Sequence, residues 1–118
     1  MIADTSVWVD HFRGAPTRLP ALLDEGVVQM HPFVAGELAL GGIPNRDEVL
    51  GWLDALPSAN AATDDEVRWL VERHRLWGRG IGWVDAHLLA AALLGSVPLL
   101  THDRTLAVVA ADLGVAPG

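Results

Sequence analysis

The chain has 118 residues, 51% of them hydrophobic, with fifteen acidic residues, eight arginines, no lysine, no cysteine and a net charge of −7. This size and composition predict one compact domain over residues 1–118. The lack of cysteine excludes disulfides, thiolate metal sites and cysteine nucleophiles. The negative charge disfavours nucleic-acid binding unless divalent cations reverse the local field at a site.

The chain carries no pattern typical of export or membrane insertion. Its first residues, Met1–Ser6, lack a basic segment followed by an apolar one. The longest apolar stretch, at 88–100, is interrupted by Gly95 and Pro98 and is shorter than the about 20 residues that span a bilayer. We therefore expect a soluble, cytoplasmic protein that does not associate with membranes.

Short apolar runs alternate with helical patterns along the whole sequence, which predicts an α/β fold with mainly parallel strands. In the first half, the expected elements are a strand at 1–3, helices at 6–13 and 19–25, a strand at 26–30, a helix opened by Pro32 and a helix at 45–56.

In the second half, the expected elements are a strand at 59–62, a helix at 64–77, a glycine-rich break at 78–82, a helix at 83–94, a buried strand at 97–100, a helix at 104–113 and a short strand at Val115. Four tryptophans are expected mainly in the core: Trp8, Trp52, Trp77 and Trp83.

Four acidic residues stand in apolar sequence surroundings: Asp4, Glu37, Asp85 and Asp103. Each has an ordinary structural explanation. Asp4 and Asp103 are well placed to cap helix N-termini, and an acid such as Asp85 is favoured in a first helical turn. Glu37 lies in mid-helix, where a salt bridge to an arginine would be the structural alternative.

Taken together, these acids suggest a metal site. Three of them fall where strands end or helices begin, and such positions converge at one edge of a parallel sheet. Converging carboxylates repel one another unless a cation intervenes, and oxygen ligands suit Mg²⁺ or Mn²⁺. Such a site hydrolyses phosphodiesters in many enzymes. Thr5, Ser6 and Thr101 stand beside the acids, either to orient ligands, water or phosphate or simply to cap helices.

Four segments carry a family resemblance: Asp4-Thr5-Ser6-Val7-Trp8-Val9-Asp10, Gly36-Glu37-Leu38-Ala39-Leu40-Gly41, Gly82-Trp83-Val84-Asp85-Ala86-His87-Leu88-Leu89-Ala90 and Thr101-His102-Asp103-Arg104-Thr105-Leu106. In this order and spacing, the set resembles the PIN-domain VapC toxins of toxin–antitoxin pairs. One position departs from the pattern, since His102 stands where the family often has a basic residue.

The resemblance implies a three-layer α/β/α sandwich, an endoribonuclease activity that depends on Mg²⁺ or Mn²⁺, inhibition by a VapB-type antitoxin, and a homodimer. It also implies that Asp4, Glu37, Asp85 and Asp103 are catalytic and bind the metal. Asp4 and Asp85 are expected to be direct ligands and Asp103 the next, with Glu37 acting directly or through water.

A basic stripe on the expected helix at 64–77 is a candidate RNA contact. Arg68, Arg75 and Arg79 share one face if the helix continues into the glycine-rich break, and a solvated charged face is the alternative. On the opposite side from the apolar stripe, Trp69 and Leu76 predict either a partner surface or burial under a neighbouring element.

Other acidic sites fit the sequence less well. Phosphorylated receiver domains and haloacid-dehalogenase-like phosphatases need a lysine near the aspartate, and this chain has none. A hydrolase with mixed ligation would pair Asp85 with His87 and His102 with Asp103. The non-enzymatic alternative is a PIN-like module that binds RNA or protein without turnover.

Overall fold

The computed structural model describes all residues, 1–118. Two short parallel strands lie at its centre, β1 (Ile2–Ala3) and β2 (Leu99–Leu100), with Ile2 opposite Leu99 and Ala3 opposite Leu100. All four residues are buried, as expected for strands covered on both faces. The parallel pairing predicted from the sequence is therefore confirmed, although only two residues of the expected strand at 97–100 are in β2.

Further segments extend the parallel arrangement on either side. Gln29 forms a parallel bridge with Ile2, and Met30 forms another with Ser58. On the other side, the Leu99 amide donates to the Val115 carbonyl over 2.8 Å, although Val115 is not part of a strand. The expected strand at 59–62 is wrong, because the pairing occurs one residue earlier. Its alanine-rich sequence has little preference for extended pairing.

Seven helices surround these strands: α1 (Thr5–Phe12), α2 (Leu19–Asp24), α3 (Pro32–Leu40), α4 (Arg46–Asp54), α5 (Asp64–His74), α6 (Trp83–Gly95) and α7 (Arg104–Asp112). Each was predicted, and most bounds agree within two residues. α5 is the exception, because it ends at His74 rather than Trp77. Arg75 adopts a left-handed conformation with φ of 53°, which turns the chain so that Leu76 is buried in the core.

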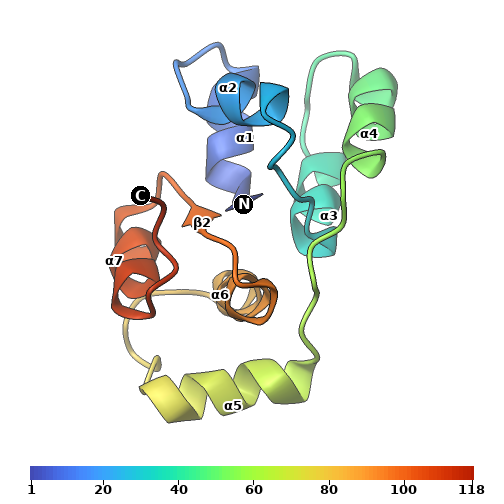
Figure 1. Ribbon diagram of the computed structural model, residues 1–118. Coiled ribbons are helices and arrows are strands. Elements are labelled where there is room, and N and C mark those ends of the chain that lie inside the picture. The colour runs from blue at the N-terminus through green and yellow to red at the C-terminus, as the bar shows by residue number, and fades with distance from the viewer.

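The helices lie on both sides of the strands, as an α/β sandwich requires (Figure 1). α6 is seen nearly end-on below β2, and α5 lies below α6, on the side away from the strands. α1 and α2 lie on the opposite side of the strands, and α3 with α4 and α7 flank the centre. The C-terminal end of α6 faces the viewer, so its N-terminal end, where Asp85 lies, is at the back of this view.

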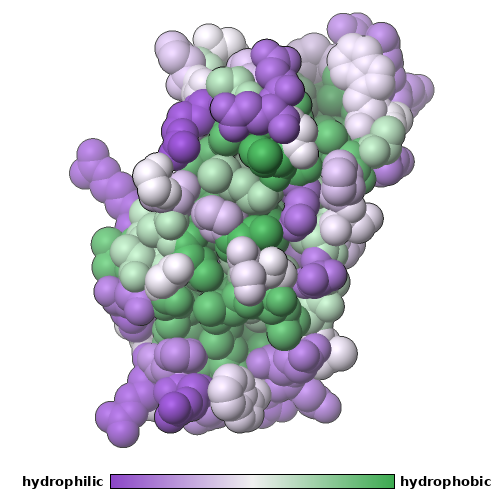
Figure 2. All heavy atoms as spheres, viewed as in Figure 1, coloured by the Kyte–Doolittle hydropathy of each residue, from purple (hydrophilic) through white to green (hydrophobic).

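The expectation that four tryptophans lie in the core is right only for Trp8. Trp52, Trp77 and Trp83 are 64%, 59% and 45% exposed. Trp69 is also exposed, whereas Leu76 is buried, so these two residues do not form one surface patch. On the face shown in Figure 2, hydrophobic side chains gather in the middle, over β2 and the near end of α6.

No helix in the chain combines the length and apolar composition needed to cross a membrane.

A buried imidazole lies at the start of α3. His31 caps this helix, because its Nδ1 accepts a hydrogen bond from the Phe33 amide over 3.0 Å. Its side chain is 1% exposed. Burial lowers the pKa of His31 to about 4, and the nearby His87 adds to this effect. His31 is therefore neutral in the folded protein at pH 7.

This buried histidine should make the protein sensitive to mild acid. Between pH 6.5 and 4 the unfolded chain takes up a proton at His31 that the folded chain does not. The free energy of unfolding should therefore decrease as the pH is lowered across this window, by up to about 3 kcal/mol from His31 alone. Urea unfolding at pH 7.5, 6, 5 and 4.5 measures this loss. His31→Asn, which keeps a helix-capping side chain, should show a shallower slope, and equal slopes would contradict the assignment.

Candidate active site

Asp4 occupies the junction between β1 and α1. Its side chain caps α1 by accepting from the Ser6 amide over 2.7 Å, and it also accepts from the Ser6 hydroxyl. Its second oxygen, Oδ2, accepts from the Thr101 hydroxyl over 2.5 Å. Asp4 is only 5% exposed. The helix-cap interpretation is confirmed, and the carboxylate accepts hydrogen bonds from Ser6 of α1 and from Thr101, the residue after β2.

Two further acids lie at helix N-termini. Asp103 caps α7, with Oδ1 accepting from the Thr105 and Leu106 amides over 2.9 and 3.1 Å. Asp85, in the first turn of α6, accepts from the Gly82 amide through Oδ2 over 3.0 Å. The positive ends of α1, α6 and α7 thus each hold one carboxylate, which helix dipoles stabilise.

The fourth acid, Glu37, lies on α3. Its Oε1 accepts from the Thr5 hydroxyl over 2.7 Å, which links α3 to the start of α1. No arginine pairs with it, so the salt-bridge alternative is wrong. Glu37 and Asp103 are exposed, so the expected apolar surroundings hold for Asp4 and in part for Asp85 only.

Asp85 is close enough to the other three carboxylates for their charges to act on it. Partial burial raises the pKa of Asp85, and the negative charges of Asp4, Asp103 and Glu37 raise it further, while the hydrogen bond from Gly82 opposes the change. Residues distant in the sequence are thus brought to one place by β1, α3, α6 and α7. We call Asp4, Glu37, Asp85 and Asp103 the acidic cluster.

Three hydroxyl groups, those of Thr5, Ser6 and Thr101, donate hydrogen bonds to Glu37 or Asp4 of the acidic cluster. The Thr101 hydroxyl donates to Asp4 and accepts from the Asp103 amide over 3.0 Å. The Ser6 hydroxyl donates to Asp4 and accepts from the His102 amide over 3.0 Å. Each of these two hydroxyls thus bonds the Asp4 carboxylate and one backbone amide of the segment after β2.

The oxygen atoms of the acidic cluster suit a hard divalent cation. Asp85, Asp103 and Glu37 each keep one oxygen that accepts no hydrogen bond. As they stand, however, no three acidic or histidine side chains are arranged as a set that could hold a metal ion. Metal binding would therefore require these side chains to move from their positions in the structure.

The histidines near the site pair with other acids than those expected. His102 Nδ1 lies 2.5 Å from Asp10 Oδ2, and His87 Nε2 lies 3.0 Å from Asp64 Oδ1. Neither histidine is hydrogen-bonded to the acid with which the mixed-ligation alternative pairs it. Asp10, six residues after Asp4, was not singled out from the sequence, because nothing local shows that α1 lies beside residue 102.

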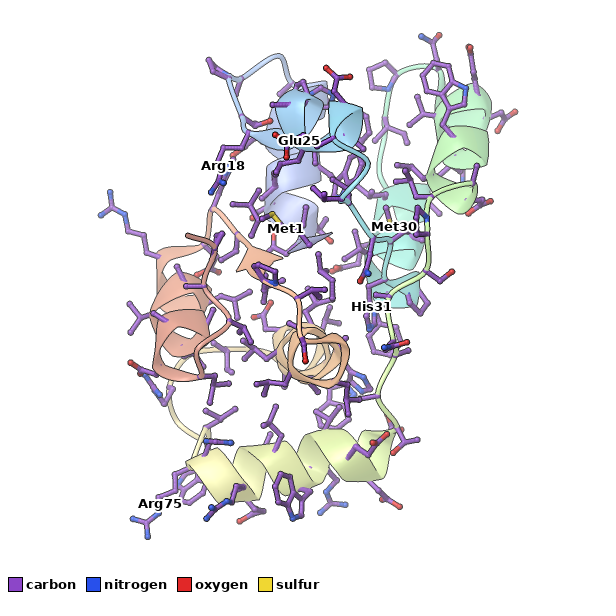
Figure 3. The ribbon with its side chains drawn as sticks, viewed as in Figure 1. Met1, Arg18, Glu25, Met30, His31 and Arg75 are labelled. Carbon is purple, nitrogen blue, oxygen red and sulfur yellow. The ribbon has the colours of Figure 1, made fainter.

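The basic stripe is not continuous. Arg68 and Arg75 are exposed, but α5 ends before Arg75, and Arg79 pairs instead with Asp112 over 2.7 Å. In Figure 3, Arg75 projects away from the molecule at one end of α5, while His31 lies at the start of α3 beside α6. The expectation that Arg68, Arg75 and Arg79 share one helix face is wrong, because the helix stops at His74.

Comparison with known proteins identifies the family to which this chain belongs. A family model for the PIN domain matches residues 1–112. The chain is also 49% identical over 117 residues to "Ribonuclease VapC32" from two strains of Mycobacterium tuberculosis, CDC 1551 / Oshkosh and ATCC 25618 / H37Rv. Each alignment covers 98% of this chain and 94% of the relative. The chain therefore belongs to the PIN-domain family and, within it, to the VapC group.

Proposed function

We propose that this chain is a metal-dependent endoribonuclease that acts as the toxin of a toxin–antitoxin pair. The observation that carries the proposal is the convergence of Asp4, Asp85 and Asp103 from the N-termini of three helices, with Glu37 beside them. The near full-length similarity to a ribonuclease supports RNA as the substrate.

The residues of the acidic cluster would have different roles in metal binding. Asp4 and Asp85 would ligate Mg²⁺ or Mn²⁺ directly, with Asp103 next and Glu37 directly or through water. A divalent ion held there would polarise the scissile phosphate and lower the pKa of bound water. Thr5, Ser6 and Thr101 would keep the carboxylates oriented, because each already donates a hydrogen bond to one of them.

The partners follow from the same family membership. We propose a VapB-type antitoxin as the inhibitor, a homodimer as the assembled state, and the cytoplasm, where RNA is available, as the place of action. Residues 1–118 would act as a single PIN-like domain, since one core cluster runs from Ile2 to Val115.

Metal removal tests the proposal. Purified protein should cleave a fluorescently labelled single-stranded RNA in Mg²⁺ or Mn²⁺, stop in EDTA, and recover when the ion is restored. Asp47→Asn, which changes an exposed acid of α4 outside the acidic cluster, should cleave like the wild type. Cleavage that persists in EDTA would contradict a metal mechanism. Binding of RNA with no cleavage by any preparation would instead support the non-enzymatic module.

The exposed Arg68 of α5 and Arg75, which follows the end of this helix, would contact the RNA backbone. Arg68→Ala/Arg75→Ala should weaken RNA binding at low salt by about 5- to 10-fold and reduce the salt dependence of binding by about one unit of log–log slope. Fluorescence anisotropy across a salt series measures both quantities. Arg18→Ala, at the start of α2, is the control. If the salt dependence of binding is unchanged in the double variant, Arg68 and Arg75 are solvated charges that do not contact RNA.

A further inference from the structure

The three residues between β2 and α7 carry two groups of the candidate site. Thr101 follows the last residue of β2, and Asp103 is the N-cap of α7. The ring of His102, which lies between them, is turned toward α1. We call residues 101–103 the connecting segment. The position of the Asp103 carboxylate depends on how this segment is held.

Three hydrogen bonds join the connecting segment to α1. The Thr101 hydroxyl donates to Asp4, the N-cap of α1, over 2.5 Å. The His102 amide donates to the Ser6 hydroxyl over 3.0 Å, and His102 Nδ1 lies 2.5 Å from Asp10 Oδ2. Ser6 and Asp10 are four residues apart, so they lie on one face of α1, about 6 Å apart along its axis. His102 is thus bonded to that face through both its backbone and its ring.

The contact between Asp10 and His102 does not depend on the charge of the ring. An ionised carboxylate has no hydrogen to donate, so Nδ1 carries the proton and donates it to Oδ2. The side chains of His102 and Asp10 are 33% and 41% exposed, and partly exposed pairs of this kind add little to global stability. Removing the contact is therefore expected to loosen the connecting segment and to leave the rest of the fold intact.

We propose that Asp10 and His102 are positioning residues for the metal site, which hold the connecting segment against α1 and so keep Asp103 beside Asp4. This inference rests on the proposed ribonuclease function and adds to its site two residues that do not contact the cation. Metal binding already requires the acids to move from their positions in the structure. A connecting segment that could also move away from α1 would raise the free-energy cost of bringing Asp103 to the ion.

Calorimetric titration of Mn²⁺ into the metal-free protein tests the proposal in the absence of RNA. We expect Asp10→Ala and His102→Ala each to weaken Mn²⁺ binding by about 10-fold, as is common for residues that orient metal ligands. The double variant should bind no more weakly than either single variant, because each substitution alone breaks the same contact. Unchanged affinity in both single variants, or losses that multiply in the double variant, would overturn the proposal.

Conservative variants separate the effect of position from that of charge. His102→Asn places an amide nitrogen near the former Nδ1, and Asp10→Asn keeps an oxygen that accepts from Nδ1, so both should retain most of the Mn²⁺ affinity. If Asp10 acted only through its charge, Asp10→Asn would lose as much affinity as Asp10→Ala and His102→Ala would lose none, which would reject positioning.

The opposite end of α7 provides a matched control. Asp112→Ala breaks the ion pair with Arg79 at that end and should leave Mn²⁺ binding unchanged. An equal loss of affinity in Asp112→Ala would show that loosening α7 at any point has this effect, and it would overturn the specific role of Asp10 and His102.

RNA cleavage in Mg²⁺ separates this inference from the proposed function. Asp10→Ala should need about 10-fold more Mg²⁺ for half-maximal cleavage and should regain most of the wild-type rate at saturating Mg²⁺. If the proteins follow the expected order of Mn²⁺ affinities but none cleaves RNA, the ribonuclease function is rejected and the positioning role is kept. Metal-dependent cleavage with the same Mg²⁺ requirement in the wild type and in both alanine variants would keep the function and reject the positioning role.

Discussion

Asp85→Asn should reduce metal-dependent RNA cleavage by about a thousandfold, equivalent to about 4 kcal/mol of lost transition-state stabilisation. The amide keeps the shape of the side chain and an oxygen that accepts from Gly82, but it supplies no negative charge to a cation. Initial rates on labelled RNA in saturating Mg²⁺ measure the loss. Asp47→Asn is the matched control, and an Asp85→Asn enzyme with more than about a tenth of the wild-type rate would contradict the assignment.

The same substitution should stabilise the metal-free protein. The pKa of Asp85 is raised by burial and by three neighbouring acids, so an ionised Asp85 costs folding free energy at neutral pH. Removing its charge should therefore raise Tm in EDTA. Mg²⁺ should then raise the Tm of the wild type and leave that of Asp85→Asn nearly unchanged. Differential scanning fluorimetry of both proteins with and without the ion makes the comparison.

Thr101→Val should weaken metal binding without unfolding the site. Valine has the same shape as threonine but loses the donor to Asp4 and the acceptor for the Asp103 amide. Removing such an orienting contact commonly costs 10- to 100-fold in metal affinity. We therefore expect the Mg²⁺ concentration for half-maximal cleavage to rise by about that factor, with most of the rate recovered at saturating Mg²⁺.

Two further variants make the result specific. Thr101→Ser keeps the hydroxyl and should require nearly as little Mg²⁺ as the wild type. Thr17→Val removes a hydroxyl that bonds only the Leu19 amide, before α2, and should not alter the metal requirement. A Thr101→Val enzyme with an unchanged Mg²⁺ requirement would show that the hydroxyl does not position Asp4 for metal binding.

Helix positions were predictable because their determinants are local. α6 and α7 begin and end within a residue of the expected bounds, since apolar periodicity and the Asp103 cap are visible in the sequence. The end of α5 was not predictable, because the chain turns at Arg75, where Leu76 is buried in the core. Tertiary packing decides that event, and no pattern between residues 64 and 79 reveals it.

The acids of the site were predictable as a set but not in their contacts. A parallel sheet implies that residues following different strands meet at one edge, which places Asp4 near Asp103. The pairs of Asp10 with His102 and of Thr5 with Glu37 join segments 92 and 32 residues apart. Such pairs depend on how the helices pack against each other, and this packing cannot be read from a single sequence.

The pairing of β1 with β2 joins the two ends of the chain, because Ala3 lies beside Leu100 and Asp4 is bonded to Thr101. A chain still being synthesised lacks this contact until the segment after α6 has emerged from the ribosome. Three of the four carboxylates are then present but have no assembled site to share. The acidic cluster can therefore assemble only once β2 has paired with β1 and Thr101 has joined Asp4 to the start of α7.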